Sequence, residues 1–330
     1  MEKKLVSLIT PCYNSGKYIH RLLDSVLSQD YPNIEMFVVD DGSTDNSKDI
    51  ILSYVPRFEN KNYKLYYFYQ DNAGQSVAVN SVLSKIKGEF LAWPDSDDYY
   101  SYSNSISSFV DFFNRIDDNY GLVRCYPVYI DEVSSQPIYG KNIKSYAEEQ
   151  FENCLYSTPD FVWPPISYMA RVACFKQANP YMRIFTAYHT PQNWQMLLPL
   201  LFSFKCYTLQ EPLSCVLVRS DSYSRGTYKT YDQLIQYYDN FENIILNTLG
   251  GITVMNQYIR EQYIKNIRIK YLREKYLLSI SHNHPQREDE YFNMLKNMGY
   301  KSDIKEKFTI FLLHNPFIYK TLRSIKRLIK

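Results

Sequence analysis

The amino-acid sequence predicts an α/β protein with a mainly parallel sheet, helices on both faces of that sheet, and a helical C-terminal extension. Two observations carry this prediction. Over the first 100 residues, short apolar runs alternate with segments of helical periodicity, as they do in parallel sheets covered on both faces. Beyond residue 231 the apolar residues follow helical spacing almost throughout.

Four strands and three helices are expected in the first 100 residues. The helix over 17–29 follows from apolar residues at helical spacing, and Ser43, Thr44 and Asp45 can cap a helix that begins near Asn46. A third helix fits 75–85. The apolar runs that predict strands cover 6–10, 36–39, 64–69 and 89–93.

The signals are weaker between residues 105 and 230. A polar segment over 222–230 contains Gly226, and it predicts a boundary near residue 228. We therefore expect a first domain over 1–228 and a helical region over 229–330. The other predicted elements are helices at 105–116, 192–204, 231–249, 253–281, 287–298 and 303–313, and a strand at 121–130.

Composition excludes several classes of protein. The chain has 330 residues, a formal net charge of +2 and 45% apolar residues, as expected for a soluble globular protein. Its six cysteines form no C-x-x-C pair, which argues against a zinc ribbon or a disulfide framework and favours reduced thiols in the cytoplasm. No apolar run reaches the ~18 residues of a membrane span. Eight of the cations lie in 301–330, so the rest of the chain is mildly acidic, which argues against nucleic-acid binding.

Polar residues follow each of the four predicted strands. Open parallel sheets bind ligands at the carboxyl ends of their strands, where the strand order reverses. We therefore expect these segments to open into one crevice. They are Pro11–Asn14, Asp40–Asp41, Gln70–Asn72 and Asp95–Asp98.

The acidic segment after the fourth strand predicts a metal site. Asp95, Asp97 and Asp98 would repel one another unless a cation lay among them. Carboxylate oxygens suit Mg²⁺ or Mn²⁺, which keep open positions for substrate phosphates. The alternative is a solvated acidic turn, and the position at the end of a buried strand favours the metal.

The motifs at these strand ends resemble those of the family-2 glycosyltransferases. The resemblance runs in order over residues 5–98 and continues more weakly to about 225. It implies a GT-A fold, a nucleotide-sugar donor, a divalent metal and inversion at the anomeric carbon. The segments that carry it are VSLITPCYN at 6–14, VVDDGSTD at 38–45, QxNxGxSxAxN at 70–80, KGEFL at 87–91 and DSDD at 95–98.

The resemblance also implies roles for individual residues. Pro11 and Tyr13 would line the nucleotide pocket, and Asp41 would accept the N3 proton of uracil or thymine. The loop over the nucleoside would comprise Gln70, Asn72 and Gly74. Asp95 would meet the ribose, and Asp97 the metal, with Asp98 an equal alternative as metal ligand. Arg219 would pair with the diphosphate or with a carboxylate of the scaffold.

The sequence departs from the family pattern at the general base. Asn193 precedes Trp194 where the family has an acidic residue, and a neutral carboxamide cannot take up a proton. Either another group such as His189 acts as the base, or Asn193 positions the acceptor, or transfer is weak. A catalytically weak or inactive nucleotide-sugar binding protein is therefore the alternative function. A nucleotidyltransferase is disfavoured, because 11–16 contains no Lys or Arg.

The resemblance implies an inverting transferase that moves sugar to a saccharide or lipid-linked saccharide acceptor in surface polysaccharide synthesis. A UDP-sugar is favoured as donor over dTDP-rhamnose. Residues 317–330 add an expectation of peripheral membrane contact, since they form a basic amphipathic pattern without acidic residues. Its apolar positions are Ile318, Leu322, Ile325 and Ile329.

Overall fold

The computed structural model describes residues 4–138, 146–187, 190–219 and 230–315. The chain divides into two compact units, and the division is not a single cut. The first unit contains Met1–Ser222 and Asn247–Met255, and the second contains Tyr223–Leu246 and Asn256–Lys330. The boundary expected near residue 228 falls among residues that the structure does not describe.

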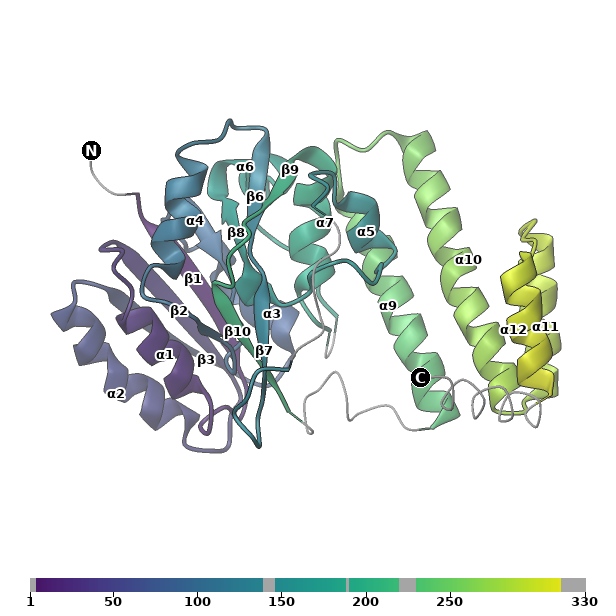
Figure 1. The fold of residues 1–330 in the computed structure, drawn as a ribbon, viewed down its shortest axis with the longest axis horizontal. Coiled ribbons are helices and arrows are strands. Elements are labelled where there is room, and N and C mark those ends of the chain that lie inside the picture. Colours follow the sequence, from purple (N-terminus) through teal and green to yellow (C-terminus); the bar gives the residue numbers. More distant parts are fainter. Residues whose placement is uncertain (1–3, 139–145, 188–189, 220–229, 316–330) are drawn as a thin grey trace. The chain divides into compact units, whose positions relative to one another are not determined.

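A seven-stranded sheet forms the centre of the first unit (Figure 1). Its strand order is β3-β2-β1-β4-β8-β6-β9. The first four strands in this order pair in parallel, as the sequence predicts, whereas β8 runs antiparallel to both β4 and β6. The strands are β1 (Val6–Cys12), β2 (Ile34–Asp41), β3 (Lys64–Gln70), β4 (Phe90–Ala92), β6 (Tyr120–Arg124), β8 (Tyr168–Arg171) and β9 (Lys205–Thr208).

A second sheet of three strands was not predicted. It has the order β5-β10-β7, with β5 (Tyr99–Tyr100), β7 (Pro127–Asp131) and β10 (Ser214–Val218). The predicted strand over 121–130 is therefore wrong as one element, since β6 and β7 belong to different sheets. Pro127 offers no N–H to a strand ladder, which accounts for a break at this position.

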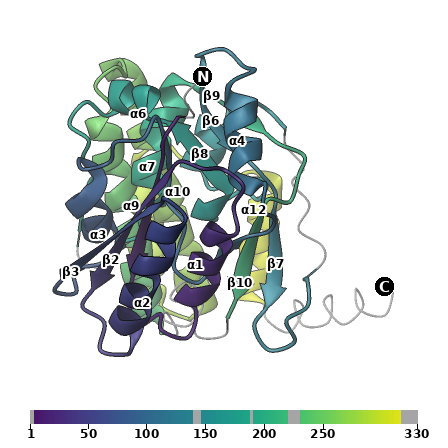
Figure 2. The ribbon, with the colours of Figure 1, turned by 90° about the vertical axis from the view of Figure 1, so that its left-hand side faces the viewer.

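Helices cover both faces of the large sheet (Figure 2). Apolar residues of α1, α2 and α4 share one core with the inward side chains of β1 and β2, and α3 packs against the same two strands from the other side. The helices of the first unit are α1 (Ile19–Leu27), α2 (Ser47–Asn60), α3 (Gln75–Leu83), α4 (Ser105–Phe113), α5 (Phe151–Leu155), α6 (Val172–Ala178) and α7 (Asn193–Ser203), with a 3₁₀ turn at Pro165–Ser167.

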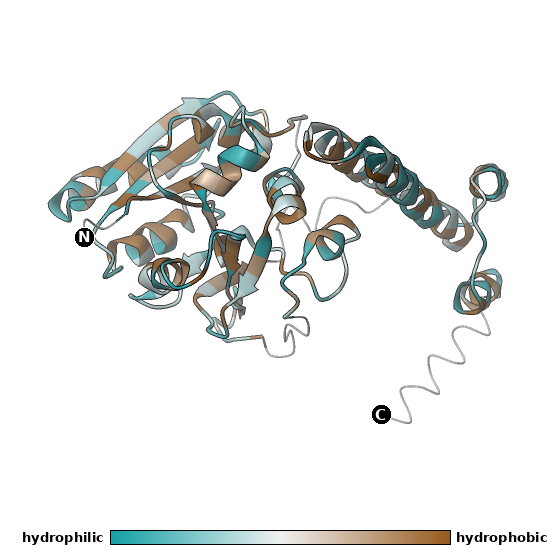
Figure 3. Ribbon diagram, turned by 90° about the horizontal axis from the view of Figure 1, so that it is seen from above, coloured by the Kyte–Doolittle hydropathy of each residue, from teal (hydrophilic) through white to brown (hydrophobic). Residues whose placement is uncertain are grey.

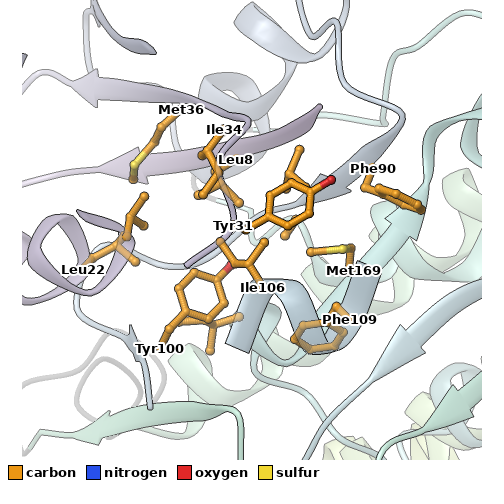
Figure 4. Close-up of a cluster of buried hydrophobic side chains, with 14 of the residues drawn as sticks. Leu8, Leu22, Tyr31, Ile34, Met36, Phe90, Tyr100, Ile106, Phe109 and Met169 are labelled. Carbon is orange, nitrogen blue, oxygen red and sulfur yellow. The ribbon is translucent and has the colours of Figure 1, made fainter. Parts of the chain in front are cut away.

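The core on the α1 side packs helices against the inner strands of the large sheet. Leu8 and Ile106 are fully buried, and Phe109 and Phe90 lie beside Met169 (Figure 4). Burial of a large apolar side chain contributes about 1.5–3 kcal/mol. This packing fixes the strand ends relative to one another, which a site built from several strand ends requires.

The second unit is helical, as predicted. Its helices are α9 (Tyr231–Gly251, of which the last residues count with the first unit), α10 (Gln257–Ser281), α11 (Pro285–Asn297) and α12 (Ile304–His314). α10 begins later than predicted because the Asn256 side chain caps it, accepting a hydrogen bond from the Tyr258 N–H. Polar and apolar residues alternate along these helices (Figure 3), and none in the described part of the chain is long and apolar enough to cross a membrane.

Candidate functional site

The strand order creates the expected ligand position. β1 lies between β2 and β4 and is parallel to both. After β1 the chain adds β2 and β3 on one side, and it then crosses back to add β4 on the other side of β1. Such a switch point leaves a crevice outside the carboxyl ends of the strands. The structure thus brings the four predicted polar segments to one edge of the sheet.

Hydrogen bonds join three of these strand-end loops. The loop after β1 is held to the loop after β2 by Gly16 N–H, which donates to Asp45 at 2.9 Å, and by Ser15 N–H, which donates to the Ser47 hydroxyl at 2.9 Å. The Ser15 and Ser96 hydroxyls lie 2.7 Å apart, which ties the same loop to the acidic segment after β4. The loops are therefore mutually positioned before any ligand binds.

The Asp41 carboxylate organises the loop after β3. It accepts hydrogen bonds from the Gln70 side chain at 2.7 Å and from the backbone N–H groups of Ala73 at 2.9 Å and Gly74 at 2.8 Å. Gly74 has φ +99° and is the N-cap residue that precedes α3. Asp41, Gln70, Asn72 and Gly74 are thus brought together, and these bonds leave acceptor capacity on Asp41 Oδ2. Asp40 supports the turn, since it accepts the Ser43 N–H at 2.8 Å.

Asp95 lies beside a residue that the sequence prediction missed. Its carboxylate accepts a hydrogen bond from the Gln192 side chain at 3.0 Å. Burial, with repulsion from Asp97 as a smaller contribution, raises the pKa of Asp95 to about 7. Gln192 immediately precedes Asn193, so the anomalous carboxamide position is next in the chain to a residue that contacts the acidic segment.

Asp98 faces away from the open edge. Its side chain is almost fully buried and accepts a hydrogen bond from the Leu217 N–H of β10 at 3.1 Å. Burial and repulsion from Asp97 and Asp95 raise the pKa of Asp98 well above its usual range. This carboxyl group links the acidic segment to the second sheet.

Asp97 is partly exposed and pairs with Arg219. The Nε of Arg219 lies 3.2 Å from Asp97 Oδ2, and their side chains are 18% and 20% exposed. The guanidinium also lies 4.5 Å from the ring centroid of Tyr18, whose hydroxyl donates to Glu132 at 2.7 Å. Arg219 follows β10, so the second sheet delivers this cation to the acidic segment.

A divalent ion fits this carboxylate by its chemistry. In the described part of the chain, no three His, Cys, Asp or Glu side chains form a group that could hold an ion by themselves. Mg²⁺ and Mn²⁺ are commonly held by one or two carboxylates together with substrate phosphates. Asp97 is partly exposed, as a ligand of that kind must be, and the Arg219 guanidinium paired with its Oδ2 would have to shift or share the carboxylate when an ion binds.

Asn193 is the first residue of α7, and its side chain is partly buried. Its Nδ2 lies 3.4 Å from the Trp163 carbonyl, and its Oδ1 is buried without a hydrogen-bond partner. Trp194 packs in the interior, where its Nε1 donates to the Cys154 carbonyl at 3.2 Å. His189 lies outside the described residues.

The two residues predicted to line the pocket after β1 differ in exposure. Pro11 is buried within β1, and Tyr13 just beyond the strand is 52% exposed. No role was predicted for Tyr18, Ser96 and Gln192, whose contacts with the predicted residues depend on pairings across the fold. Ser96 lies within the predicted acidic segment and Gln192 is the neighbour of Asn193, whereas no sequence signal singled out Tyr18.

The parallel sheet, the switch point at β1 and the acidic segment after β4 together define an α/β protein of the GT-A type. Residues 7–173, just over half of the chain, match the family model named Glycosyl transferase family 2. The chain belongs to this family of glycosyltransferases.

Curated relatives agree with this assignment over part of their lengths. An uncharacterized glycosyltransferase of Rickettsia typhi is 36% identical over 152 residues, which is 46% of this chain and 45% of the relative. The Bacillus subtilis protein TuaG, which carries the name of a teichuronic acid biosynthesis glycosyltransferase, is 42% identical over 96 residues, or 29% of this chain and 37% of TuaG. The chain spans less than half the length of these relatives.

Solved structures share the fold at low sequence identity. The crystal structure of Staphylococcus aureus TarS 1-349 in complex with UDP-GlcNAc has a TM-score of 0.62 at 20% identity, covering 89% of this chain and 80% of that one. The mannosyltransferase PcManGT from Pyrobaculum calidifontis, in complex with GDP-Man and Mn²⁺, has a TM-score of 0.51 at 16% identity, covering 98% and 83%.

Proposed function

We propose that this protein transfers a sugar, with inversion, from a nucleotide-sugar donor to a hydroxyl of a saccharide or lipid-linked saccharide acceptor in surface polysaccharide synthesis. The observation that carries the proposal is the arrangement at the switch point. Asp41 after β2 and Asp95 and Asp97 after β4 lie on strand-end loops that are both hydrogen-bonded to the loop after β1. A UDP-sugar is the favoured donor. Support for this choice is the UDP-GlcNAc complex of TarS, a protein of the same fold.

Each residue has a role that its surroundings permit. Asp41 would read a pyrimidine N3–H with its remaining acceptor capacity, beside the loop it holds in place. Asp95 would bind a ribose hydroxyl, and Asp97, rather than the buried Asp98, would hold Mg²⁺ or Mn²⁺. The bound ion would neutralise charge on the departing nucleoside diphosphate. Arg219 is close enough to Asp97 to pair with the same diphosphate.

The acceptor side of the reaction is carried by Asn193. Its Oδ1 is buried without a hydrogen-bond partner, and a rotation of the side chain into the crevice would let the carboxamide accept a hydrogen bond from the acceptor hydroxyl and so orient the nucleophile. It cannot remove the proton, which must pass to another base, and His189 is the candidate from the sequence. Peripheral membrane contact through residues 317–330 stays part of the proposal and would bring a lipid-linked acceptor near.

Transfer assays over UDP-, GDP- and dTDP-sugars with Mn²⁺ test the proposal, with calorimetry of UDP binding in parallel. Turnover toward a saccharide or lipid-linked acceptor supports it. Tight UDP binding without turnover toward any acceptor would favour the nucleotide-sugar binding protein instead. Absence of both manganese-linked UDP binding and turnover would overturn the proposal.

A further inference from the structure

One face of α12 leaves apolar side chains uncovered within the helical unit. Ile304, Phe308 and Phe311 are 85%, 56% and 49% exposed, and their spacing of four and three residues places them on one side of the helix. We call these three residues the outer face of α12. Isolated exposed apolar residues are ordinary, but an aligned set on one helix marks a contact surface.

The opposite side of α12 is already occupied. Ile310 and Leu313 pack against the core of the helical unit. Glu306 is buried there, where it accepts hydrogen bonds from Arg273 at 2.5 Å and from the Tyr300 hydroxyl. The Asp303 side chain caps the helix by accepting the Glu306 N–H at 2.7 Å. These contacts fix the orientation of α12, so the outer face is presented without rearrangement of the unit.

Cations flank the outer face. At roughly 100° of rotation per residue, Lys305 and Lys307 lie on either side of the apolar line, and both are exposed. The two acidic residues of this segment are engaged elsewhere, because Asp303 caps the helix and Glu306 is buried against Arg273. On neighbouring α11, Glu288 contacts His314 at 2.9 Å and Glu290 contacts Arg287 at 2.8 Å.

We propose that the outer face of α12, with Lys305 and Lys307, binds the surface of an anionic lipid bilayer. Apolar side chains enter the boundary between headgroups and acyl chains while the lysines contact the lipid phosphates. Neither contribution suffices alone, since stable peripheral binding usually needs two signals. Membrane contact would then involve α12 in addition to residues 317–330, and it does not depend on the donor, the acceptor or catalysis.

Charge favours an anionic bilayer over two other partners for the outer face of α12, namely residues 317–330 and a second copy of the chain. Residues 317–330 carry an apolar pattern of their own, but they contain five cations and no acidic residue, so docking them on α12 would set cations beside Lys305 and Lys307. A second copy of the chain would place the same two lysines against their counterparts. An anionic surface is the partner that both the apolar line and its flanking cations complement.

Flotation of the full-length protein with vesicles tests the proposal. Vesicles of phosphatidylcholine alone are compared with vesicles that also contain phosphatidylglycerol. We expect the wild type to bind the anionic vesicles. The double variant Phe308→Ser/Phe311→Ser should partition onto them about tenfold more weakly. In Lys305→Gln/Lys307→Gln, each lysine replaced should weaken partition roughly fivefold.

Matched controls lie on α10. Tyr258→Ser removes a 70% exposed aromatic residue roughly 20 Å along α10 from Arg273, and Lys265→Gln/Arg268→Gln removes two exposed cations. Both should bind vesicles as the wild type does, and all variants should keep the wild-type melting temperature and UDP affinity. Wild-type partition of the Phe308→Ser/Phe311→Ser variant, or equal loss in the Tyr258→Ser control, would overturn the proposal.

Hydrogen exchange tests whether residues 317–330 or a second copy of the chain, rather than lipid, covers the outer face of α12. Backbone amides of 304–311 should exchange more slowly when anionic vesicles are added. In buffer without vesicles, these amides should exchange at the same rate in the wild type and in a variant that lacks residues 317–330. If the deletion or dilution of the protein raises exchange of 304–311 without lipid, the face is covered by residues 317–330 or by a second copy. Either result would contradict lipid binding by the outer face.

Discussion

Arg219 and Asp97 form an ion pair that joins the two sheets of the first unit. The Nε of Arg219, which follows β10, lies 3.2 Å from Oδ2 of Asp97, in the segment between β4 and β5. Both side chains are partly exposed at the open edge of the large sheet. The site thus holds a positive charge beside the carboxylate that we propose as a metal ligand.

Replacing Arg219 should weaken binding of nucleoside diphosphates. Arg219→Gln removes the guanidinium from the proposed diphosphate position, and loss of a hydrogen bond to a charged group costs about 1.5–3 kcal/mol, or roughly 10- to 100-fold in affinity. Calorimetry of UDP binding measures the effect. The control is Arg57→Gln, which breaks an exposed pair with Asp24 at 2.9 Å on the surface. Equal UDP affinity of Arg219→Gln and wild type would argue that Arg219 serves only the scaffold.

Asp97 and Asp98 should respond differently to the loss of charge. Asp97→Asn should abolish the dependence of UDP affinity on Mn²⁺, because a neutral amide is a poor ligand for a hard cation. Asp98→Asn should retain that dependence, since Asp98 is buried and an amide oxygen can still accept the Leu217 N–H. Titrations of UDP with and without Mn²⁺ decide the matter, and the opposite pattern would assign the metal to Asp98.

Gly42→Ala should disturb the nucleoside loop. Gly42 has φ +80°, and a Cβ there would lie 2.8 Å from the Asn72 backbone nitrogen. We expect a loss of about 1–3 kcal/mol in unfolding free energy, together with weaker UDP binding. Gly250→Ala in α9, where a Cβ would meet nothing within 4 Å, should instead stabilise by about 0.5–1 kcal/mol. Denaturant unfolding and UDP titration check both variants; an unchanged Gly42→Ala variant would refute the steric argument.

The raised pKa of Asp95 predicts a pH dependence of stability. Because burial raises the pKa to about 7 in the folded protein, the folded state binds more protons than the unfolded state between about pH 4 and 7. Unfolding free energy should therefore fall as pH rises through this range in metal-free protein. Asp95→Asn should reduce that slope, and Asp98→Asn should reduce it as well, because burial also raises the pKa of the Asp98 carboxyl. A slope that survives in the double variant Asp95→Asn/Asp98→Asn would locate the titrating group elsewhere.

Asn193→Asp tests the missing carboxylate directly. If Asn193 occupies the position of the general base, an aspartate there should raise the transfer rate by roughly 10²-fold, and Asn193→Ala should lower it. Rates measured against pH distinguish a new base, which loses activity on protonation, from a change in acceptor positioning alone. A variant with Asp at this position that is no faster than wild type at any pH would place the base elsewhere.

Local patterns were sufficient to predict the first four strands of the sheet. The apolar runs that became β1, β2 and β4 are buried on both faces, whereas β3 at the sheet edge is only partly buried. Each of the four ends in polar residues that parallel pairing brings to one edge, so periodicity placed Asp41, Asp95 and Asp97 at the same edge of the sheet. The four helices of the second unit followed from helical spacing in the same way.

Contacts that depend on long-range pairing were beyond the sequence. β5 has two residues and joins β10 more than 100 residues later, so no local pattern could place Leu217 against Asp98 or Arg219 against Asp97. The Gln192 contact with Asp95 likewise joins α7 to the segment after β4. Short strands contain too few residues to show a periodicity, which is why the sequence named Arg219, Asp97 and Asp98 without predicting which of their contacts form.

The path of the chain between the two units constrains how the protein can be divided experimentally. Leu249, Ile252 and Met255 are almost fully buried and count with the first unit, although residues 223–246 before them count with the second. A recombinant fragment that stops at residue 228 would lack these side chains and leave apolar surface open. We expect such a fragment to be prone to aggregation, and a single protease cleavage near 228 to release no independently stable half.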